Sequence, residues 1–228
     1  YRDAFWGAGE ILEYGHPRND IFWTAFDEVA QKVRNFYGLK EEKVVFYVPT
    51  FRDQDKSDVA KLRVEELLVS LQKRFGGEWI FAVRRHPRMK REEVGCYVQD
   101  LETMLQAGKV CDMTEYPDIQ ELLATADVVI TDYSSAIFDF MLTGRPGFLL
   151  AEDYERYENI RGLYYPLEQS PFPLARSGRE LAKKIEMFDA DAYESKVAEF
   201  LAQKGSVEDG MAASRVVRLV KEVIDKDE

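Results

Sequence analysis

The feature that most constrains this chain is a repeated alternation between short apolar runs and longer amphipathic segments. Four runs are rich in β-branched and aromatic residues and end at residues that break regular structure; they cover 44–48, 79–83, 128–131 and 147–150. Short runs that are apolar throughout are typical of strands buried on both faces of a parallel sheet. The pattern therefore predicts a sheet whose strands lie in the protein core.

The segments between these runs carry apolar residues at helical spacing. We expect one helix over 20–37, closed by Gly38, and another over 58–75, before Gly76. Strands that alternate with helices require right-handed crossovers. The sequence thus predicts a Rossmann-like, doubly wound α/β domain with a parallel sheet. Shorter helices are predicted over 117–125 and 134–142, a long ordered loop over 161–176, and three final helices over 178–188, 191–202 and 211–226.

Charge limits the partners that this surface can bind. The chain has 42 acidic and 31 basic residues and a net charge of −11. Such a balance disfavours general binding to nucleic acid or to anionic membranes. Any anionic ligand must therefore be held by a local cluster of donors. No apolar run approaches the roughly 18 residues of a membrane span.

The cysteines and the first residues of the chain indicate neither a bound metal nor a signal peptide. Cys96 and Cys111 lie far apart, without a CxxC pair or a histidine cluster, so neither a disulfide framework nor a zinc site is indicated. We interpret them as two reduced thiols of a cytosolic protein. The start of the chain is not a signal peptide, and its first residue, Tyr1, leaves open that the chain is a piece of a longer protein.

Polar clusters that directly follow the expected strands are the first places to look for a site, because ligands bind beyond the carboxyl ends of parallel strands. The first cluster contains Thr50 and Arg52, which follow Val48. A hydroxyl and a guanidinium can both bind phosphate oxygens. An ordinary turn with an exposed arginine explains the same residues.

The second cluster follows Val83 and gathers Arg84, Arg85, His86 and Arg88 within five residues of an acidic chain. A histidine in this setting can donate to a phosphoryl oxygen or protonate a departing phosphate, because its ordinary pKa lies near neutrality. The alternative is a solvated basic loop.

The third cluster follows the run that ends at residue 130 and contains Asp132, Ser134, Ser135 and Asp139. We expect Ser134 to be the N-cap of the next helix, with free backbone N–H groups facing an anion. Asp139 lies four residues after Ser135 and can accept hydrogen bonds from a ribose or polyol hydroxyl. The structural alternative is that Ser134 only caps the helix and that Asp139 pairs with Arg145.

Other candidate sites are weaker. Residues 15–20 are explained as the start of a helix, apart from Arg18. Asp53 and Asp55 have no third carboxylate nearby, so no metal is expected. The absence of GxGxxG, P-loop and GxSxG motifs disfavours a dehydrogenase, an ATPase or an α/β-hydrolase.

Taken together, the short motifs form an order that is more specific than any one of them. They are Gly-x-Pro-Arg-Asn-Asp (15–20), Pro-Thr-Phe-Arg (49–52), Arg-x-His-Pro (84–87), Ile-x-Glu-Leu-Leu (119–123), Ala-Asp (126–127), Ile-Thr-Asp-Tyr-Ser-Ser (130–135), Phe-Asp-Phe (138–140), Arg-Pro (145–146), Arg-Gly (161–162) and Asp-Gly (209–210). This order resembles the CDP-glycerol glycerophosphotransferase family over nearly the whole chain.

The resemblance implies a GT-B architecture, in which two Rossmann-like domains face each other across a cleft. Residues 1–228 look like the C-terminal, CDP-polyol-binding domain, with C-terminal helices from about residue 178. The implied reaction is attack by a hydroxyl of a teichoic-acid-like acceptor on the β-phosphorus of CDP-glycerol, which releases CMP. In this family, CDP-glycerol is the donor substrate and no separate cofactor is expected.

The resemblance also implies roles for single residues. His86, with Arg18 nearby, would be catalytic at the transferring phosphoryl group. The substrate-binding residues would be Thr50, Arg52, Arg84, Asp132, Ser134, Ser135 and Asp139, with Asp139 near ribose or glycerol and the segment 112–116 near cytosine. Ala213 departs from the pattern, since the family often has a hydroxyl there, and the family's partner histidine lies in the other domain.

The implied partners are the CDP-polyol, a lipid-linked polyol-phosphate acceptor and an N-terminal GT-B domain that is absent from this chain; nucleic acid is not expected. The implied location is the cytoplasm, at the inner face of the cell membrane. Relatives that use CDP-ribitol share these motifs. Two alternatives remain: a GT-B glycosyltransferase or epimerase-like domain that binds UDP-sugars, which would prefer UDP over CDP, and a non-catalytic nucleotide-binding module.

Overall fold

The protein is built around one parallel sheet, as seen in a computed structural model that describes residues 9–50, 62–86 and 98–227. Its six strands lie in the order β3-β2-β1-β4-β5-β6, and every neighbouring pair is parallel. This is the strand order of the doubly wound Rossmann fold. The strands are β1 (Lys43–Val48), β2 (Trp79–Val83), β3 (Val110–Asp112), β4 (Val128–Thr131), β5 (Gly147–Leu150) and β6 (Leu174–Ala175).

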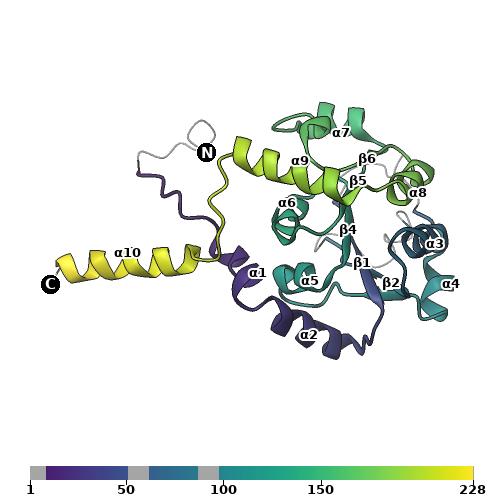
Figure 1. Ribbon diagram of the computed structural model, residues 1–228, viewed down its shortest axis with the longest axis horizontal. Coiled ribbons are helices and arrows are strands. Elements are labelled where there is room, and N and C mark those ends of the chain that lie inside the picture. The colour runs from purple at the N-terminus through teal and green to yellow at the C-terminus, as the bar shows by residue number, and fades with distance from the viewer. Residues whose placement is uncertain (1–8, 51–61, 87–97, 228) are drawn as a thin grey trace.

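Helices cover both faces of this sheet. Helix α5 packs against α2 on one side, and α3 packs against α8 on the other (Figure 1). The helices are α1 (Ile21–Thr24), α2 (Phe26–Tyr37), α3 (Val64–Phe75), α4 (Leu101–Gln106), α5 (Ile119–Thr125), α6 (Ala136–Phe140), α7 (Tyr154–Arg161), α8 (Gly178–Glu186), α9 (Ala190–Gln203) and α10 (Ala212–Asp227), with 3₁₀ turns η1 (Pro17–Asn19), η3 (Met141–Thr143) and η4 (Leu167–Gln169).

The core is formed by the strands that the apolar runs predict. All four predicted strands are present, and their side chains are almost entirely buried. Phe46, Phe81 and Phe148 are completely inaccessible to solvent. The predicted fold class, a doubly wound parallel α/β domain, is confirmed.

Several predicted boundaries are wrong. The helix expected over 20–37 is interrupted at Ala25, whose backbone (φ −148°) leaves the helical region between α1 and α2. The predicted end is correct, because Gly38 adopts the left-handed conformation (φ 66°) that closes α2. The expected loop over 161–176 contains η4 and β6 and begins at the last residue of α7.

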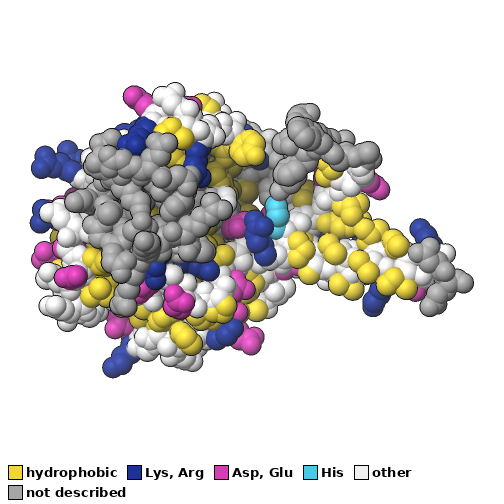
Figure 2. All heavy atoms as spheres, turned by 180° about the vertical axis from the view of Figure 1, so that it is seen from behind, with side chains coloured by type: hydrophobic (Ala, Val, Ile, Leu, Met, Phe, Trp, Pro, Cys, Tyr) yellow, Lys and Arg dark blue, Asp and Glu magenta, His cyan; other side chains and the backbone are white. Residues whose placement is uncertain are grey.

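Helix α10 projects from the body of the protein (Figure 1). Its first turn is held by Asp20, whose carboxylate accepts hydrogen bonds from the backbone N–H groups of Ala212 (3.0 Å) and Ala213 (2.7 Å). Apolar side chains, including Val217 and Val220, are exposed along it, and Figure 2 shows them gathered on the projecting arm. Across the described ranges, no helix combines the length and the apolar character that crossing a bilayer requires.

Candidate functional site

A hollow of about 380 Å³ opens at the carboxyl ends of β1, β2 and β4. Strands β2 and β4 flank β1, so the hollow lies where the strand order reverses, which is where doubly wound folds bind ligands. Loops that are far apart in sequence meet here. The lining residues are Val48, Pro49, Thr50, Arg84, Arg85, His86, Ile119, Tyr133, Ser134 and Ser135.

This hollow brings together five of the residues that the sequence assigns to a phosphate site: Thr50, Arg84, His86, Ser134 and Ser135. They come from the loops after three different strands. Hydroxyl, guanidinium and imidazole groups are all able to donate hydrogen bonds to an anion. The arrangement is therefore suited to a ligand that carries phosphate groups.

Asp132 fixes the loops after β1 and β4 relative to each other. Its carboxylate accepts hydrogen bonds from the backbone N–H groups of Thr50 (2.9 and 3.2 Å) and Tyr133 (2.6 Å). The side chain is buried, since Asp132 is only 3% exposed. Its geometry supports a role in positioning the loops, and the direct substrate contact that the sequence suggests stays a prediction.

The serine pair opens α6, although the predicted N-cap is wrong by one residue. Ser135 is the N-cap, and its side chain forms no cap hydrogen bond. The Ser134 hydroxyl oxygen accepts a hydrogen bond from the backbone N–H of Ala136 at 3.3 Å. The exposed Ser135 hydroxyl therefore remains at the wall of the hollow, outside the capping interaction.

Arg84 is a half-buried cation of the hollow. Its Nη1 atom is buried and forms no hydrogen bond within the part of the chain that the structure describes. Burial lowers the pKa of Arg84, while the nearby Asp118 carboxylate opposes this change. Because a buried guanidinium with an unused donor is costly, an anionic ligand that accepts from it would be stabilised.

Arg85 organises the segment after β3 that the resemblance assigns to cytosine. Its backbone N–H donates to the Thr114 hydroxyl at 3.0 Å, and its guanidinium lies 3.8 Å from the carboxylates of Asp112 and Glu115. His86 is exposed at the hollow, next in the chain. Arg84, Arg85 and His86 thus all line the hollow, and Arg85 also holds the loop after β3.

Arg18 and Asp139 bind each other and do not line the hollow. The Arg18 guanidinium donates to Asp139 at 3.1 and 3.2 Å, and the same carboxylate accepts from Asn19 (3.1 Å) and Gln120 (3.2 Å). The proposed pairing of Asp139 with Arg145 is wrong. The Arg145 guanidinium donates instead to backbone carbonyls at 3.1 and 2.7 Å.

The remainder of the Gly-x-Pro-Arg-Asn-Asp motif joins the two ends of the described chain. Asp20 holds the start of α10, and the His16 imidazole and backbone N–H both contact the Glu208 carboxylate. Sequence reasoning missed this connection, because His16 and Glu208 are separated by 192 positions. Arg52, Asp53, Asp55 and Arg88 lie outside the described residues.

Comparison with known proteins places this geometry in context. Residues 1–222 match the family described as CDP-Glycerol:Poly(glycerophosphate) glycerophosphotransferase. The teichoic acid poly(glycerol phosphate) polymerase of Staphylococcus epidermidis is 30% identical over 96% of this chain, which corresponds to 31% of that protein.

Solved structures of a teichoic acid polymerase are also similar to this chain. The structure of the wall teichoic acid polymerase TagF is 29% identical, with a TM-score of 0.78, over 99% of this chain and 55% of that chain. A TagF variant soaked with CDPG is 30% identical, with a TM-score of 0.75, over 99% of this chain and 54% of that chain. The chain therefore spans from about a third to just over half of these relatives, and its α/β domain corresponds to the C-terminal half of the GT-B-like polymerase.

Proposed function

Because the chain belongs to the CDP-glycerol:poly(glycerophosphate) glycerophosphotransferase family, we propose that it is the donor-binding part of a transferase. The transferase moves a polyol phosphate from CDP-glycerol, or from a related CDP-polyol, to the hydroxyl of a teichoic-acid-like acceptor and releases CMP. The observation that carries this proposal is the hollow in which Thr50, Arg84, His86, Ser134 and Ser135 meet. Support comes also from the related TagF variant that was soaked with CDPG.

In this proposal the diphosphate of the donor lies between the serine pair and Arg84. The hydroxyls of Thr50, Ser134 and Ser135 donate hydrogen bonds to the phosphate oxygens, and the Nη1 group of Arg84 gains an acceptor. Asp132 and Asp139 position the loops and the start of α6 without contacting the phosphates, and Arg18 acts through Asp139. Arg52 remains a predicted further ligand of the diphosphate.

The proposed reaction needs positioning and charge neutralisation more than covalent help from the protein. The acceptor hydroxyl releases its proton to water as its oxygen forms a bond to the β-phosphorus of the donor, and the bond from that phosphorus to the bridging oxygen breaks. The electron pair leaves with CMP, whose phosphate gains negative charge. His86 lines the hollow, and in its protonated form it can donate a proton or a hydrogen bond to this leaving group.

Calorimetric titration of the chain with CDP, CDP-glycerol and UDP-glucose tests the nucleotide specificity of the proposal. We expect CDP and CDP-glycerol to bind and UDP-glucose to bind much more weakly. The variant Arg84→Gln should lose about 10- to 100-fold in CDP affinity, because a charge-assisted hydrogen bond is worth about 1.5–3 kcal/mol. Arg179→Gln, at an exposed position on α8, is the matched control and should bind like the wild type.

A result in which UDP-glucose binds as well as CDP would favour the alternative of a UDP-sugar enzyme. If the wild type and Arg84→Gln bound CDP with equal affinity, the phosphates of the donor would not bind in this hollow.

The two histidines of the chain provide a test of catalysis in the longer protein. His86→Ala should lower kcat by about 10²- to 10⁴-fold, the usual contribution of a general acid or base, and should change CDP affinity little. His16→Ala is the control, because His16 contacts Glu208 on the segment before α10. Unchanged transfer by His86→Ala would contradict the assigned role and would favour a module that only binds nucleotide.

A further inference from the structure

A groove of about 750 Å³ lies at the outer edge of the sheet, where β6 is the last strand. Its walls are the segment 168–174, helix α8 and the first turns of α9. Segment 170–173 comes directly before β6, so the groove lies toward the amino ends of the parallel strands, whereas the proposed phosphate hollow opens at their carboxyl ends. The two share no lining residue, so the proposed reaction leaves this groove unused.

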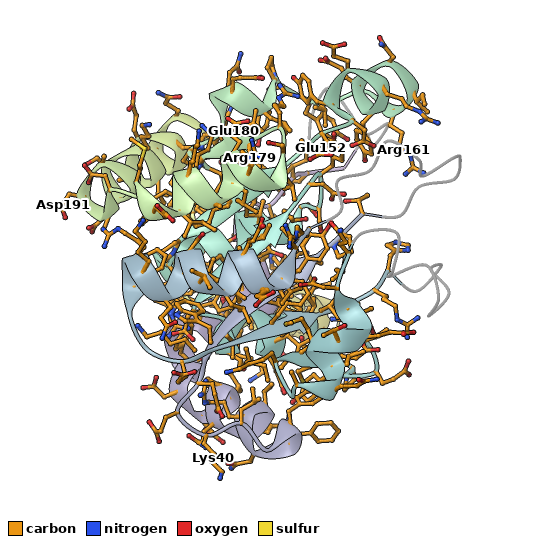
Figure 3. All side chains as sticks on the ribbon, turned by 90° about the vertical axis from the view of Figure 1, so that its right-hand side faces the viewer. Lys40, Glu152, Arg161, Arg179, Glu180 and Asp191 are labelled. Carbon is orange, nitrogen blue, oxygen red and sulfur yellow. The ribbon has the colours of Figure 1, made fainter. Side chains whose placement is uncertain are left out.

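The carboxylates of the groove already accept hydrogen bonds within the protein. Glu168 accepts from the Arg176 guanidinium at 2.7 Å. Glu180, labelled on α8 in Figure 3, accepts from the backbone N–H of Arg176 at 2.8 Å and lies 3.3 Å from the ammonium group of Lys184. Asp189 is the N-cap of α9 and accepts from a backbone N–H of its first turn at 3.0 Å. The acidic side chains of the groove are therefore occupied.

Two lysines of the groove have no such partner. In the described part of the chain, no carboxylate pairs with Lys183 or Lys196, whose side chains are both exposed. Lys183 lies one turn before Met187 at the end of α8, and Lys196 lies one turn after Ala192 on α9, so each helix presents a cation beside the groove. In a chain with a net charge of −11, two unpaired cations on the walls of one groove favour an anionic ligand.

The floor of the groove is aromatic. Phe172, Phe188 and Tyr193 are buried, and the Tyr193 ring centroid lies 6.5 Å from that of Phe172 and 5.2 Å from that of Phe188. Aromatic rings offer apolar faces to the C–H groups of a ligand. Of the large hydrophobic side chains that line the groove, Met187 alone is mostly exposed. The groove therefore combines an apolar floor with cations on its walls.

We propose that this groove binds an anionic polyol-phosphate chain, the polymer that the transferase of the proposed function extends; the inference rests on that function. The spaced phosphates of such a chain match the unpaired Lys183 and Lys196, and its C–H groups match the aromatic floor. A volume of 750 Å³ lies within the roughly 300–1,000 Å³ of clefts that hold drug-sized ligands. The groove thus has room for a segment of the chain.

The charges and the shape of the groove disfavour two other polyanionic surfaces. A nucleic acid presents a dense row of phosphates, and tight binding takes about 6–10 cationic contacts, more than this groove offers. A membrane surface requires an apolar face that projects from the protein, and here Met187 is the one large hydrophobic side chain that does so among those lining the groove. Binding a part of the polymer away from the phosphate hollow would raise the effective concentration of its reactive end.

Binding of a fluorescent glycerol phosphate hexamer to the folded chain, measured by anisotropy, tests this inference. At 0.15 M salt, where charges more than about 8 Å apart are screened, the hexamer should bind to the wild type. Lys183→Glu/Lys196→Glu should weaken its binding about 10-fold or more, because each exposed ion pair contributes up to about fivefold and the new carboxylates repel phosphate. CDP affinity should stay unchanged, because neither lysine lines the phosphate hollow.

A control pair and a change of shape complete the test. Lys40→Glu/Lys221→Glu makes the same change in net charge at exposed positions outside the groove, so it should bind the hexamer like the wild type. Ala192→Trp places a larger side chain in the groove at an exposed position of α9, which avoids a folding defect. It should weaken the hexamer about 10-fold and leave CDP affinity unchanged.

The outcomes distinguish this inference from the proposed function. If the wild type binds CDP but not the hexamer, or if both lysine pairs weaken the hexamer equally, only the assignment of the groove is overturned. If phosphatidylglycerol vesicles bind to the wild type in place of the hexamer, and Lys183→Glu/Lys196→Glu abolishes that binding, the groove is a lipid site and the assignment is wrong. If the wild type binds neither CDP nor CDP-glycerol, the proposed function fails, and the polymer assignment fails with it.

Discussion

At residue 139 a single carboxylate accepts from three side chains of other segments: Arg18, Asn19 and Gln120. The Arg18 side chain is 56% exposed, so its ion pair with Asp139 should contribute less than about 1 kcal/mol. Removing the carboxylate has a larger effect, because two part-buried amide donors lose their acceptor.

Urea denaturation of two variants, which measures the free energy of unfolding, tests this difference. We expect Asp139→Ala to lower the free energy of unfolding by about 1–3 kcal/mol and Arg18→Ala by less than about 1 kcal/mol. Equal losses for the two variants would show that the pair, and not the wider network, holds the start of α6.

Cys111 provides a pH-dependent prediction at the same scale. Burial raises the pKa of this thiol to about 11, because the thiolate is disfavoured away from water. Near neutral pH, Cys111 should react with a thiol reagent far more slowly than an ordinary cysteine with a pKa of about 8.5. The rate should rise only as the pH approaches 11. Labelling of a Cys96→Ser variant measures this, and rapid labelling of the folded chain at neutral pH would contradict it.

The residues of the site divide by how far the sequence can predict them. Thr50, Arg84, His86 and the serine pair were predictable, because each directly follows an apolar strand and such positions converge at one edge of a parallel sheet. The contacts of Asp132 with Thr50 and of Asp139 with Arg18 were not, because these partners lie 82 and 121 positions away. Linear spacing carries no information about such contacts.

At the scale of elements, the length of a strand or helix and the burial of its side chains decide whether the sequence pattern can predict it. The four predicted strands are buried runs of four to six residues, whereas β3 and β6 have three and two residues. Runs this short have no readable period. Helix α7 was missed because Tyr154 is its one buried residue among those described, so no apolar stripe marks it. Ala25 interrupts a helical pattern without a glycine or proline to indicate the break.

The turn before α10 provides the test at this scale. Gly210 has φ +78°, and a Cβ atom there would lie 2.6 Å from the Cβ of Trp23. Gly210→Ala should therefore lower the free energy of unfolding by roughly 2–4 kcal/mol, from backbone strain and steric overlap together. Gly38→Ala is the matched control: its φ is +66° and the added atom meets nothing within 4 Å. That variant should lose only about 1–2 kcal/mol, and equal losses would show that the contact with Trp23 is relieved without cost.

At the scale of the whole molecule, α10 contrasts with the compact body. Beyond Arg215, its described side chains are mostly exposed, including Val217, Val223 and Ile224. Removing residues 216–228 should change the free energy of unfolding by less than about 1 kcal/mol, because little surface is buried there. Asp20→Ala, which removes the acceptor for the first turn of α10, should cost more, about 0.5–2 kcal/mol. A large loss on truncation, measured by urea denaturation, would mean that the arm packs against the body in solution.

The central claim is that loops from three strands form one pocket for two linked phosphates in an otherwise acidic molecule. A crystal structure with CDP-glycerol tests it most directly. We expect both phosphates in the hollow lined by Thr50, Arg84, His86, Ser134 and Ser135, with a guanidinium nitrogen of Arg84 within hydrogen-bond distance of a phosphate oxygen. Phosphates bound elsewhere on the chain, with this hollow filled only by water, would contradict the claim.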